Sequence, residues 1–441
     1  MHILFLTDNF PPEANAPAIR TFEHCREWVA AGHAVTVVTC APNFPKGVVF
    51  GGYRNKLWQS ETMQGIRVIR VWSYITRNEG FTKRILDYLS YMVTGGIAAL
   101  FVRRVDVVVG TSPQFFTACA SYAVAGLKRR PFVFELRDIW PESIRTVGAM
   151  KSSRVLDMLE KLELFLYRRA GVVISVTHAF RQNLIDRGID ANKIHVVTNG
   201  VDTSRFAPMP KDATLERELR LQEKFVAGYV GTHGLAHALE TVLEAARTLA
   251  AAPDGNDIRI LMLGDGAKRA QLKARAESEG LYNIIFLESV PREQVALYWS
   301  LLDASIIHLK KNDLFKTVIP SKLFECMAMG IPVIHGVEGE SADIVRQTGT
   351  GLTIAPEDPE ALANALRRLR DDRALRHKMR SAGPATAPRY DRQVLAKRML
   401  DILSQLPLRQ EKRFCDGRSK ACQHSTARRV SVNDGSDTGS H

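Results

Sequence analysis

Short apolar runs rich in β-branched residues recur along the chain, and each leaves room for a helix before the next. Runs that are nearly all apolar are typical of strands covered on both faces, as in parallel sheets. Because strands that alternate with helices form right-handed βαβ units, the pattern predicts an α/β protein. The strands predicted in the first part of the chain are 2–7, 34–41, 66–74, 105–112, 131–138, 171–177 and 194–200. Those predicted in the second part are 225–232, 258–266, 283–290, 304–309, 332–337 and 351–356.

The two series of strands predict two doubly wound Rossmann-like domains, at residues 1–203 and 204–387. A polar stretch that contains prolines, residues 199–224, lies between the two series. Residues 388–406 have the pattern of a last amphipathic helix. Residues 407–441 are polar and have no apolar period, so we expect them to be disordered and dispensable for folding.

Composition narrows the class of protein. The chain has 441 residues, of which 45% are hydrophobic, enough for two sizeable cores. Its six cysteines have no paired or metal-binding spacing, which favours a reducing compartment. The longest apolar run, 88–102, is shorter than the roughly 20 residues of a membrane-spanning helix. An apolar strand follows Met1 directly where a signal peptide would lie, so we expect a cytoplasmic protein.

The formal net charge is +13, and the basic excess lies mainly in residues 1–203. Such an excess predicts an anionic partner, which is a phosphate group, a membrane surface or a nucleic acid. No nucleic-acid recognition motif or array of stacking aromatics accompanies it, so we expect no nucleic acid. Residues 77–93 suggest reversible binding to an anionic membrane surface, the alternative being a solvated helix face with a core stripe. The residues concerned are Lys83, Arg84, Phe81, Tyr88 and Tyr91, with a second basic cluster at Lys128, Arg129 and Arg130.

In open α/β sheets ligands bind outside the carboxyl ends of the strands, so the turns after the strands are the places for chemistry. The first such turn is "TDNFPPEANAPAIR", residues 7–20, which contains Glu13, Asn15 and Arg20. It is either a proline-stiffened surface loop or a loop whose small residues let a ligand approach the backbone. In the second case Arg20 would contact an anion.

The second turn is "ELRDIWPES", residues 135–143, where three charges follow a buried strand. Charges in such a place are costly unless they are paired or used. Either Arg137 forms a structural ion pair with Glu135 or Asp138, or Arg137 and Asp138 belong to a functional site.

The third turn lies in "YVGTHGLAHALETVLEAA", residues 229–246. Gly231, Thr232 and Gly234 join a strand to a helix there, and such a loop can present backbone N–H groups and a helix N-terminus to an anion. An ordinary βα turn would look similar. A further glycine-rich turn, "LGDGAKRAQL" (263–272), is of the same kind.

The fourth turn is "PSKLFECMAMGIPVI", residues 320–334, a short helix pattern that Gly330 ends. Ser321, Lys322 and Glu325 share one face of that helix. The helix N-terminus and Lys322 would favour a phosphate group, and Glu325 could accept hydrogen bonds from sugar hydroxyls. The alternative is a surface Lys–Glu pair.

Taken in order, these motifs resemble the GT-B glycosyltransferases of family four, the retaining class that uses nucleotide sugars. The resemblance covers roughly residues 1–406. Within the family, the chain is similar to the branch that includes fucosamine transferases of bacterial surface-polysaccharide clusters. It rests on "PPEANAPAIR", "GHAVTVVT", "ELRDIWPES", "VVTNGVDTSRF", "YVGTHGLAHALETVLEAA", "LGDGAKRAQL", "LYNIIFLESVPREQVALYWSLLDASII" and "PSKLFECMAMGIPVI".

The resemblance implies two Rossmann-like domains that face a cleft, with helix 388–406 crossing back to the first domain. It implies that the second domain binds a nucleotide-diphospho-sugar and that the first takes the acceptor, a polyprenyl-diphosphate-linked or other glycan. Residues implied to bind the donor are Gly231, Thr232, Gly234, Ser321, Lys322 and Glu325, where Glu325 binds the ribose. Residues assigned to catalysis are Asp138, Arg137 and Glu325, and the acceptor-side loop contributes Glu13, Asn15 and Arg20.

The chain also departs from the family pattern. Thr317 stands where the family has a glutamate, and the usual Arg and Lys clamp of the diphosphate is missing, so Lys310, Lys311 or Lys316 could substitute. Arg137 precedes Asp138 where many relatives have a histidine.

No Asp-x-Asp metal motif is present in the sequence, so we expect a reaction without metal or other cofactor. Backbone N–H groups, a helix N-terminus and lysine would meet the charge on the leaving phosphate. The alternatives are a nucleotide-sugar epimerase or hydrolase on the same fold, or an inactive sugar-nucleotide-binding scaffold.

Overall fold

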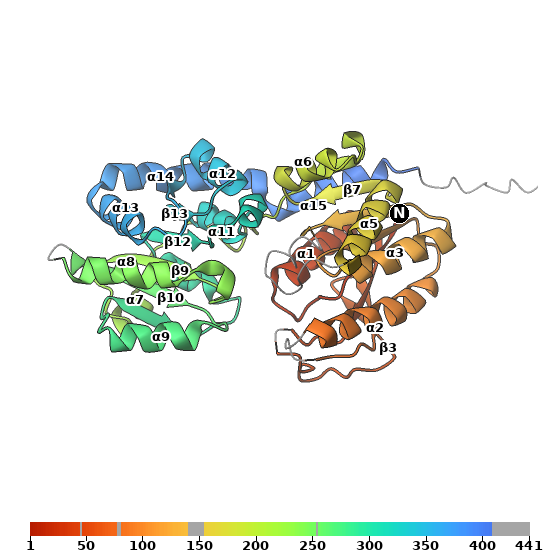
Figure 1. Cartoon of the computed structure of the whole chain (residues 1–441), viewed down its shortest axis with the longest axis horizontal. Helices are drawn as coiled ribbons and strands as arrows, with labels where there is room; N and C mark the ends of the chain where they lie inside the picture. Colours follow the sequence, from red (N-terminus) through yellow and green to blue (C-terminus); the bar gives the residue numbers. More distant parts are fainter. Residues whose placement is uncertain (45, 77–80, 140–153, 253–254, 408–441) are drawn as a thin grey trace, which may run out of the picture. The chain divides into compact units, whose positions relative to one another are not determined.

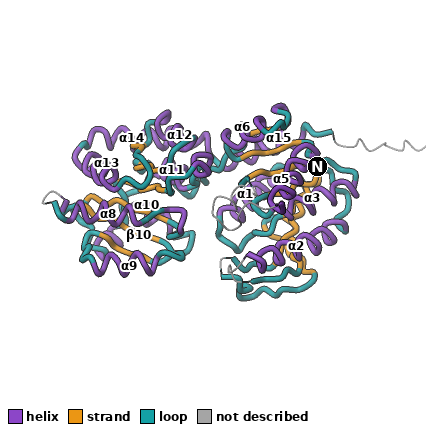
Figure 2. Tube along the Cα trace, viewed as in Figure 1, coloured by secondary structure: helices purple, strands orange, loops and turns teal. Residues whose placement is uncertain are grey.

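A computed structural model of the chain describes residues 1–44, 46–76, 81–139, 154–252 and 255–407. The expectations for residues 140–143 and for the tail beyond residue 407 lie outside this part of the chain. The described residues form two separate sheets with helices on both faces of each, as the two series of apolar runs predict (Figures 1 and 2).

The first sheet has eight strands in the order β3-β4-β2-β1-β5-β6-β7-β8. All neighbouring strands are parallel except β3, which is antiparallel to β4. The strands are β1 (His2–Leu6), β2 (Ala34–Cys40), β3 (Trp58–Met63), β4 (Ile66–Val71), β5 (Val107–Thr111), β6 (Phe132–Leu136), β7 (Val172–Ser175) and β8 (Ile194–Val196).

Strand β3 is the element that the pattern of apolar runs missed. Its sequence, WQSETM, is mostly polar, and its residues alternate between exposed and partly buried. It pairs with β4 in a hairpin from Trp58 opposite Val71 to Met63 opposite Ile66. An edge strand of this kind needs no continuous apolar run, because it is not covered on both faces as the central parallel strands are.

The helices of the first half cover the two faces of this sheet. Alternate residues of β1 point to opposite faces. Leu4 and Leu6 join the core under α2, α3 and α5, whereas Ile3 and Phe5 join the core under α1 and α15. The helices are α1 (Ala16–Ala30), α2 (Phe81–Leu100), α3 (Phe115–Lys128), α5 (Arg154–Arg169), α6 (His178–Asp186) and the 3-10 turn η1 (Ala191–Lys193).

The second sheet has six parallel strands in the order β11-β10-β9-β12-β13-β14. The strands are β9 (Phe225–Val230), β10 (Ile258–Leu263), β11 (Ile284–Leu287), β12 (Ala304–His308), β13 (Val333–Gly336) and β14 (Gly351–Thr353). One face packs on α8, α9 and α13, and the other on α10, α11 and α12. The helices are α7 (Ala213–Glu218), α8 (Glu240–Ala250), α9 (Arg269–Ser278), α10 (Val295–Ser300), α11 (Lys322–Met329), α12 (Glu340–Thr348), α13 (Pro359–Asp371) and α14 (Arg373–Thr386), with 3-10 turns η2 (Leu235–His237), η4 (Asp313–Thr317) and η5 (Ala387–Tyr390).

The last helix of the described chain, α15 (Arg392–Ser404), belongs to the core of the first sheet. Leu395, Met399 and Leu403 pack beside Trp28 of α1, and the Trp28 indole donates a hydrogen bond to the Ala396 carbonyl at 2.9 Å. The chain therefore leaves the second sheet and returns to the first, which confirms the predicted GT-B arrangement of two Rossmann-like sheets with a crossing C-terminal helix.

Candidate donor and acceptor pockets

A pocket of about 250 Å³ lies beyond the end of β9, and we call it the β9 pocket. Its walls come from the loop after β9, from β12 and from the segment that begins α11. The lining residues are Tyr229, Thr232, His237, Ile307, His308, Leu309, Val318, Pro320, Ser321 and Lys322. Three predicted donor residues, Thr232, Ser321 and Lys322, are thus brought together from segments about 90 residues apart.

Gly231 is what allows the loop after β9 to pack against Lys322. Its φ of +135° is one that residues with a side chain rarely adopt, and a Cβ there would lie 2.1 Å from the Lys322 ammonium nitrogen. Gly264, in the turn after β10, backs the same loop, since its Cβ would lie 1.9 Å from the Gly231 carbonyl oxygen. Only glycine at both places permits this close approach.

Lys322 opens α11 and is the cation of the β9 pocket. Its Nζ lies 4.4 Å from the centroid of the Tyr229 ring and 3.4 Å from the Tyr229 hydroxyl. Burial lowers its pKa to about 8, although Glu325 acts to raise it. Among the described residues no carboxylate forms an ion pair with it. The ammonium is therefore mostly charged at neutral pH and lies beside a helix N-terminus, where an anion would be stabilised.

The two histidines of the β9 pocket are uncharged at neutral pH. Burial and the charge of Lys322 lower the pKa of His237 to about 4. Burial also lowers the pKa of His308, whose ring nitrogens contact the His237 carbonyl at 2.8 Å and the Glu357 N–H at 2.9 Å. Lys322 is thus the one lining residue that carries a charge.

Gly234 and Ser321 complete the predicted loop and helix start. Gly234 precedes η2, and Ser321 precedes α11 without making a side-chain cap hydrogen bond. Thr232 is exposed, and its carbonyl accepts a hydrogen bond of 2.8 Å from the Tyr229 hydroxyl. Gly330 ends α11 with a φ of +67°, as the sequence predicts.

Glu325 lies one turn along α11 but does not line the β9 pocket. Burial raises its pKa, whereas the charges of Arg392, Lys322 and Arg292 lower it. Both arginines bind the buried carboxylate of Glu23, Arg292 at 2.7 Å. Glu325 therefore lies in a cationic surrounding in which a partly buried carboxylate can accept hydrogen bonds from hydroxyl groups.

The lysines that we considered as a diphosphate clamp do not line this pocket. Lys310 and Lys311 are exposed, and Lys316 is bound to Asp313 at 2.8 Å and to Glu338 at 3.5 Å. Thr317 donates its hydroxyl to the Leu314 carbonyl at 2.6 Å. Lys322 is the lysine that lines this pocket.

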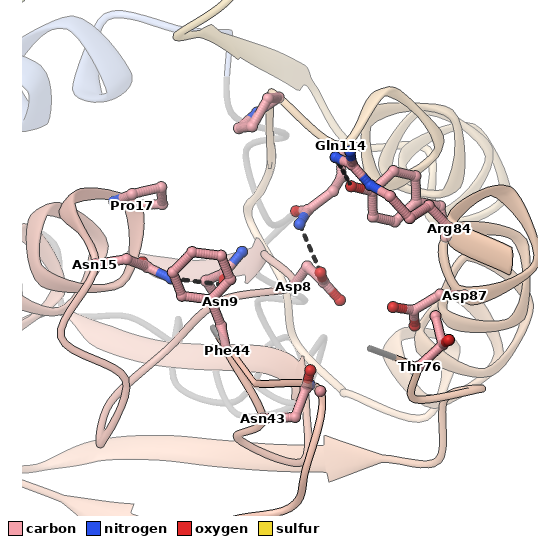
Figure 3. Close-up of a pocket in the computed structure, with 13 residues that line it drawn as sticks. Asp8, Asn9, Asn15, Pro17, Asn43, Phe44, Thr76, Arg84, Asp87 and Gln114 are labelled. Carbon is pink, nitrogen blue, oxygen red and sulfur yellow. Dashed lines mark hydrogen bonds between the residues drawn. The ribbon is translucent and has the colours of Figure 1, made fainter. Parts of the chain in front are cut away.

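A second pocket, of about 270 Å³, lies beyond the end of β1, and we call it the β1 pocket (Figure 3). Amide, carboxyl, hydroxyl and guanidinium groups converge on it. The lining residues are Asp8, Asn9, Asn15, Pro17, Asn43, Phe44, Gly47, Thr76, Arg84, Asp87, Tyr88, Pro113 and Gln114.

Two carboxyl groups, Asp8 and Asp87, face the β1 pocket from different elements (Figure 3). Asp8 accepts a hydrogen bond of 2.6 Å from the Gln114 side chain. Burial, with Asp87 and Glu13 nearby, raises the pKa of Asp8 to about 8, and burial raises that of Asp87 to about 6. At neutral pH Asp8 therefore keeps its proton for much of the time. A carboxylic acid among amides can donate and accept hydrogen bonds, as sugar hydroxyls require.

The acceptor-side residues named from the sequence have different places. Asn15 lines the β1 pocket, caps α1 through the Ala18 N–H at 2.9 Å and donates to Asn9 at 2.8 Å (Figure 3). Glu13 is buried and does not line the pocket, and its Oε1 accepts from the N–H groups of Asn43 and Phe44, each at 2.8 Å. Burial raises the pKa of Glu13.

Arg20 is not the anion contact that the sequence suggested. It is 5% exposed, and its Nε lies 2.9 Å from Oε1 of the buried Glu135. Its other donors bind the carbonyls of Val197, at 2.9 Å, and Thr198, at 2.5 Å. The guanidinium therefore joins α1, β6 and the end of β8 within the first sheet's own structure.

Arg137 and Asp138 do not line either pocket. Their backbone N–H groups donate to the Ser112 hydroxyl at 2.8 and 3.2 Å, and the Arg137 guanidinium donates to the Pro17 carbonyl at 3.2 Å. Burial lowers the pKa of Arg137 to about 10. The ion pair at this strand end joins Glu135 to Arg20, so the pairing of Arg137 that we considered is not the one observed.

Sequence reasoning missed Tyr229, Asp8, Asp87 and Gln114. Tyr229 and Asp8 end or follow apolar runs, so position after a strand was a usable signal. Asp87 lies inside α2 and Gln114 at the start of α3, and only the folded sheet brings them to the same edge.

Comparison with known proteins gives consistent results. Residues 15–200 match the family model "Glycosyl transferase 4-like domain", and residues 211–386 match "Glycosyl transferases group 1". The chain is 26% identical over 383 residues to WcaI of Escherichia coli K12, whose name assigns it to colanic acid biosynthesis, with 83% of this chain and 91% of WcaI covered.

Solved structures show the same fold. HepE of Anabaena in complex with UDP-glucose has a TM-score of 0.68 at 18% identity, and the match covers 92% of this chain and 100% of HepE. WaaG, a glycosyltransferase involved in lipopolysaccharide biosynthesis, has a TM-score of 0.65 at 15% identity, with 91% and 100% covered. Since the two family models account for both sheets, the chain belongs to the group 1 glycosyl transferases, a retaining family of enzymes that use nucleotide sugars.

Proposed function

We propose that the β9 pocket holds the diphosphate of a nucleotide-sugar donor and that the β1 pocket holds the acceptor. The observation that carries the first half is the Lys322 ammonium, charged, without a carboxylate partner among the described residues, and packed against Gly231 at the start of α11. A diphosphate there would meet the ammonium, the backbone N–H groups of the glycine loop and a helix N-terminus.

The second half rests on the chemistry of the β1 pocket. It presents two raised-pKa carboxyl groups and four amide side chains, a set that pairs with hydroxyl groups in both directions. A phosphate group would meet the negative charge of any carboxyl group that ionises. We therefore assign this pocket to the hydroxyl-rich glycan part of the acceptor.

In the proposed reaction the chain positions the two substrates and stabilises charge. The bond from the anomeric carbon to the diphosphate oxygen breaks, and a bond to the acceptor hydroxyl oxygen forms on the same face. The hydroxyl proton passes to the leaving phosphate oxygen. Lys322 and the N-terminus of α11 would stabilise the developing diphosphate charge, and Glu325 would bind the ribose hydroxyls.

The names of WcaI and WaaG point to bacterial surface glycans, so we propose a step in surface-polysaccharide synthesis with a lipid-linked glycan as acceptor. The test measures release of nucleoside diphosphate from UDP-, GDP- and dTDP-sugars, with and without a synthetic polyprenyl-diphosphate-linked saccharide. A transferase should release nucleoside diphosphate at least about tenfold faster when the acceptor is present. Equal release in both cases would indicate a hydrolase, and binding without any turnover would indicate a scaffold.

A further inference from the structure

The outer face of α2 is apolar although it is exposed. Leu86, Val93, Ile97 and Leu100 follow helical spacing along this face, and Phe101 directly after the helix is 71% exposed. The opposite face carries Tyr91, Ala98 and Ala99 into the core of the first sheet. An apolar stripe on each side of one helix is more than the fold needs.

The β3–β4 hairpin and the segment after it extend this apolar surface. The rings of Trp58 and Phe101 meet edge to face, with centroids 6.4 Å apart. The Thr94 hydroxyl of α2 donates to the Trp72 carbonyl at 2.7 Å, which holds Trp72 beside the helix. We call the surface made by Leu86, Val93, Ile97, Leu100, Phe101, Trp58 and Trp72 the α2 patch; all seven side chains are exposed.

Cations surround the α2 patch. Lys83 and Arg84 precede it on α2, Arg103 and Arg104 follow it, and Arg54 and Lys56 lie before β3; all six are exposed. Two nearby carboxylates, Glu61 and Asp87, are used elsewhere. Glu61 binds Arg70 at 2.6 Å, and Asp87 lines the β1 pocket.

We propose that the α2 patch docks on the surface of an anionic lipid bilayer, with its apolar side chains among the acyl chains and its cations at the headgroups. Contiguous exposed apolar surface with a basic rim is the pattern of interfacial binding, and Trp and Tyr are favoured at that depth. The charge complementarity of the rim decides for lipid over a second copy of this chain, whose equally basic rim would repel it. No helix in the part of the chain that the structure describes is long and apolar enough to cross a bilayer.

The structure also corrects which side chains form such a surface. Tyr91 is 1% exposed and its hydroxyl donates to the Thr7 and Val38 carbonyls, and Tyr88 lines the β1 pocket. Lys128 donates to the carbonyls of Leu100 and Val102. The sequence predicted that aromatic residues form the apolar part of the membrane-binding surface. In the structure, aliphatic residues on the exposed face of α2 supply most of it.

The α2 patch and the β1 pocket share one helix, since Arg84, Asp87 and Tyr88 line the pocket. Docking would bring a wall of the proposed acceptor site to the lipid surface. This consequence rests on the proposed function, whereas the docking itself does not.

The test is co-sedimentation of the full chain, without substrates, with vesicles of phosphatidylcholine alone or mixed with phosphatidylglycerol. We expect binding to the anionic vesicles at an ionic strength of about 0.01 M and loss of most of it at about 0.5 M. The double variant Ile97→Glu with Phe101→Glu should lower partitioning at least about tenfold. Arg103→Gln with Arg104→Gln should lower it on anionic vesicles only, by about fivefold for each charge.

Val394→Glu on α15 is the matched control, because Val394 and Ile97 are both 53% exposed. It should bind vesicles as the wild type does. Unchanged nucleoside-diphosphate binding by all variants shows that they are folded and separates this proposal from the proposed function. Wild-type protein that stays in the supernatant with anionic vesicles at low salt would overturn the proposal. So would a stable dimer that Ile97→Glu dissociates, since a second copy would then cover the patch.

Discussion

The β9 and β1 pockets have similar places in their sheets and differ in electrostatic character. Each lies beyond the carboxyl end of a central parallel strand, at a loop that leads toward a helix. In the β9 pocket the charged lining residue is the cation Lys322. In the β1 pocket two carboxyl groups, with pKa values of about 8 and 6, lie beside the cation Arg84. The plan of the fold locates the pockets, and a few side chains decide what each can bind.

The difference has a local cause in each case. A glycine after β9 leaves room for an ammonium group from α11. After β1 the chain has Asp8, and its burial, together with the carboxyl group of Asp87 from α2, disfavours its ionisation. The first arrangement suits a diphosphate, and the second suits hydroxyl groups.

Arg20 is a cation near the first sheet that, unlike Lys322, we expect to stabilise the fold and not to bind a ligand. Arg20→Met leaves the buried carboxylate of Glu135 without its partner, and we expect a loss of about 3–5 kcal/mol in the free energy of unfolding. Urea denaturation measures this. Arg26→Met on the same helix removes a more exposed pair with Glu27 and should cost less than about 1 kcal/mol. Equal effects of the two variants would show that Arg20 is not structural.

Gly231→Ala should disrupt the β9 pocket directly. The added methyl group would occupy the place of the Lys322 ammonium, so the best-bound of UDP, GDP and dTDP should bind about 100-fold more weakly, or about 3 kcal/mol. Gly234→Ala is the control, because Gly234 has an ordinary φ of −106° and its nearest neighbour to a Cβ is 3.3 Å away. If both variants bind equally well in fluorescence or calorimetric titration, the close packing at Gly231 does not form the site.

Much of the fold follows from the sequence because buried parallel strands leave apolar runs of recognisable length. The edge strand β3 was not predicted, since its residues are largely polar and alternate between exposed and partly buried positions. Lys322, Ser321 and the glycine loop were identified because helix starts and glycine turns have local signals. Asp87 was not, because a carboxylate in the middle of α2 looks like a surface residue until the sheet places it.

The sequence suggested that Arg20 contacts an anionic ligand, whereas in the structure Arg20 pairs with Glu135. Its sequence position, early in a helix after a strand, is the position of an anion-binding residue. Whether such a guanidinium faces a ligand or an internal carboxylate depends on β6, more than 100 residues away. Long-range pairing of this kind leaves no local signal.

Glu325→Ala tests the carboxylate of the donor side. We expect nucleoside-diphosphate binding to weaken by about 1.5–3 kcal/mol, the range for a hydrogen bond to a charged group. Deoxyribose analogues provide the control, because Glu325→Ala should reduce the difference between ribo and deoxyribo ligands. Since Glu325 does not line the β9 pocket, unchanged binding would leave it with an electrostatic role toward Arg392 and Arg292.

Asp8 of the β1 pocket should make the free energy of unfolding depend on pH. The pKa of Asp8 in the folded chain, about 8, lies above its unfolded value of about 3.9, so the unfolded state releases the proton first and stability falls as pH rises from about 4 to 8. Asp8→Asn removes this loss and keeps the oxygen that accepts from Gln114. We expect the variant to be more stable than wild type by at least about 1 kcal/mol at pH 8 and equal to it near pH 4. A stability difference independent of pH would show that Asp8 is ionised in the folded chain.

The most direct test of the proposed donor site is calorimetric titration of wild type and Lys322→Met with UDP, GDP and dTDP at pH 7.5 and 9.5. Both values lie above the phosphate pKa of about 6, so the charge of the diphosphate is constant, and ionisation of the base acts equally on the two proteins. We expect Lys322→Met to weaken binding about 100-fold at pH 7.5. We also expect wild-type affinity to fall about tenfold further than that of Lys322→Met between the two pH values, because the ammonium with pKa about 8 loses its proton. Equal affinity of the two proteins at both pH values would contradict the assignment of the β9 pocket to the donor diphosphate.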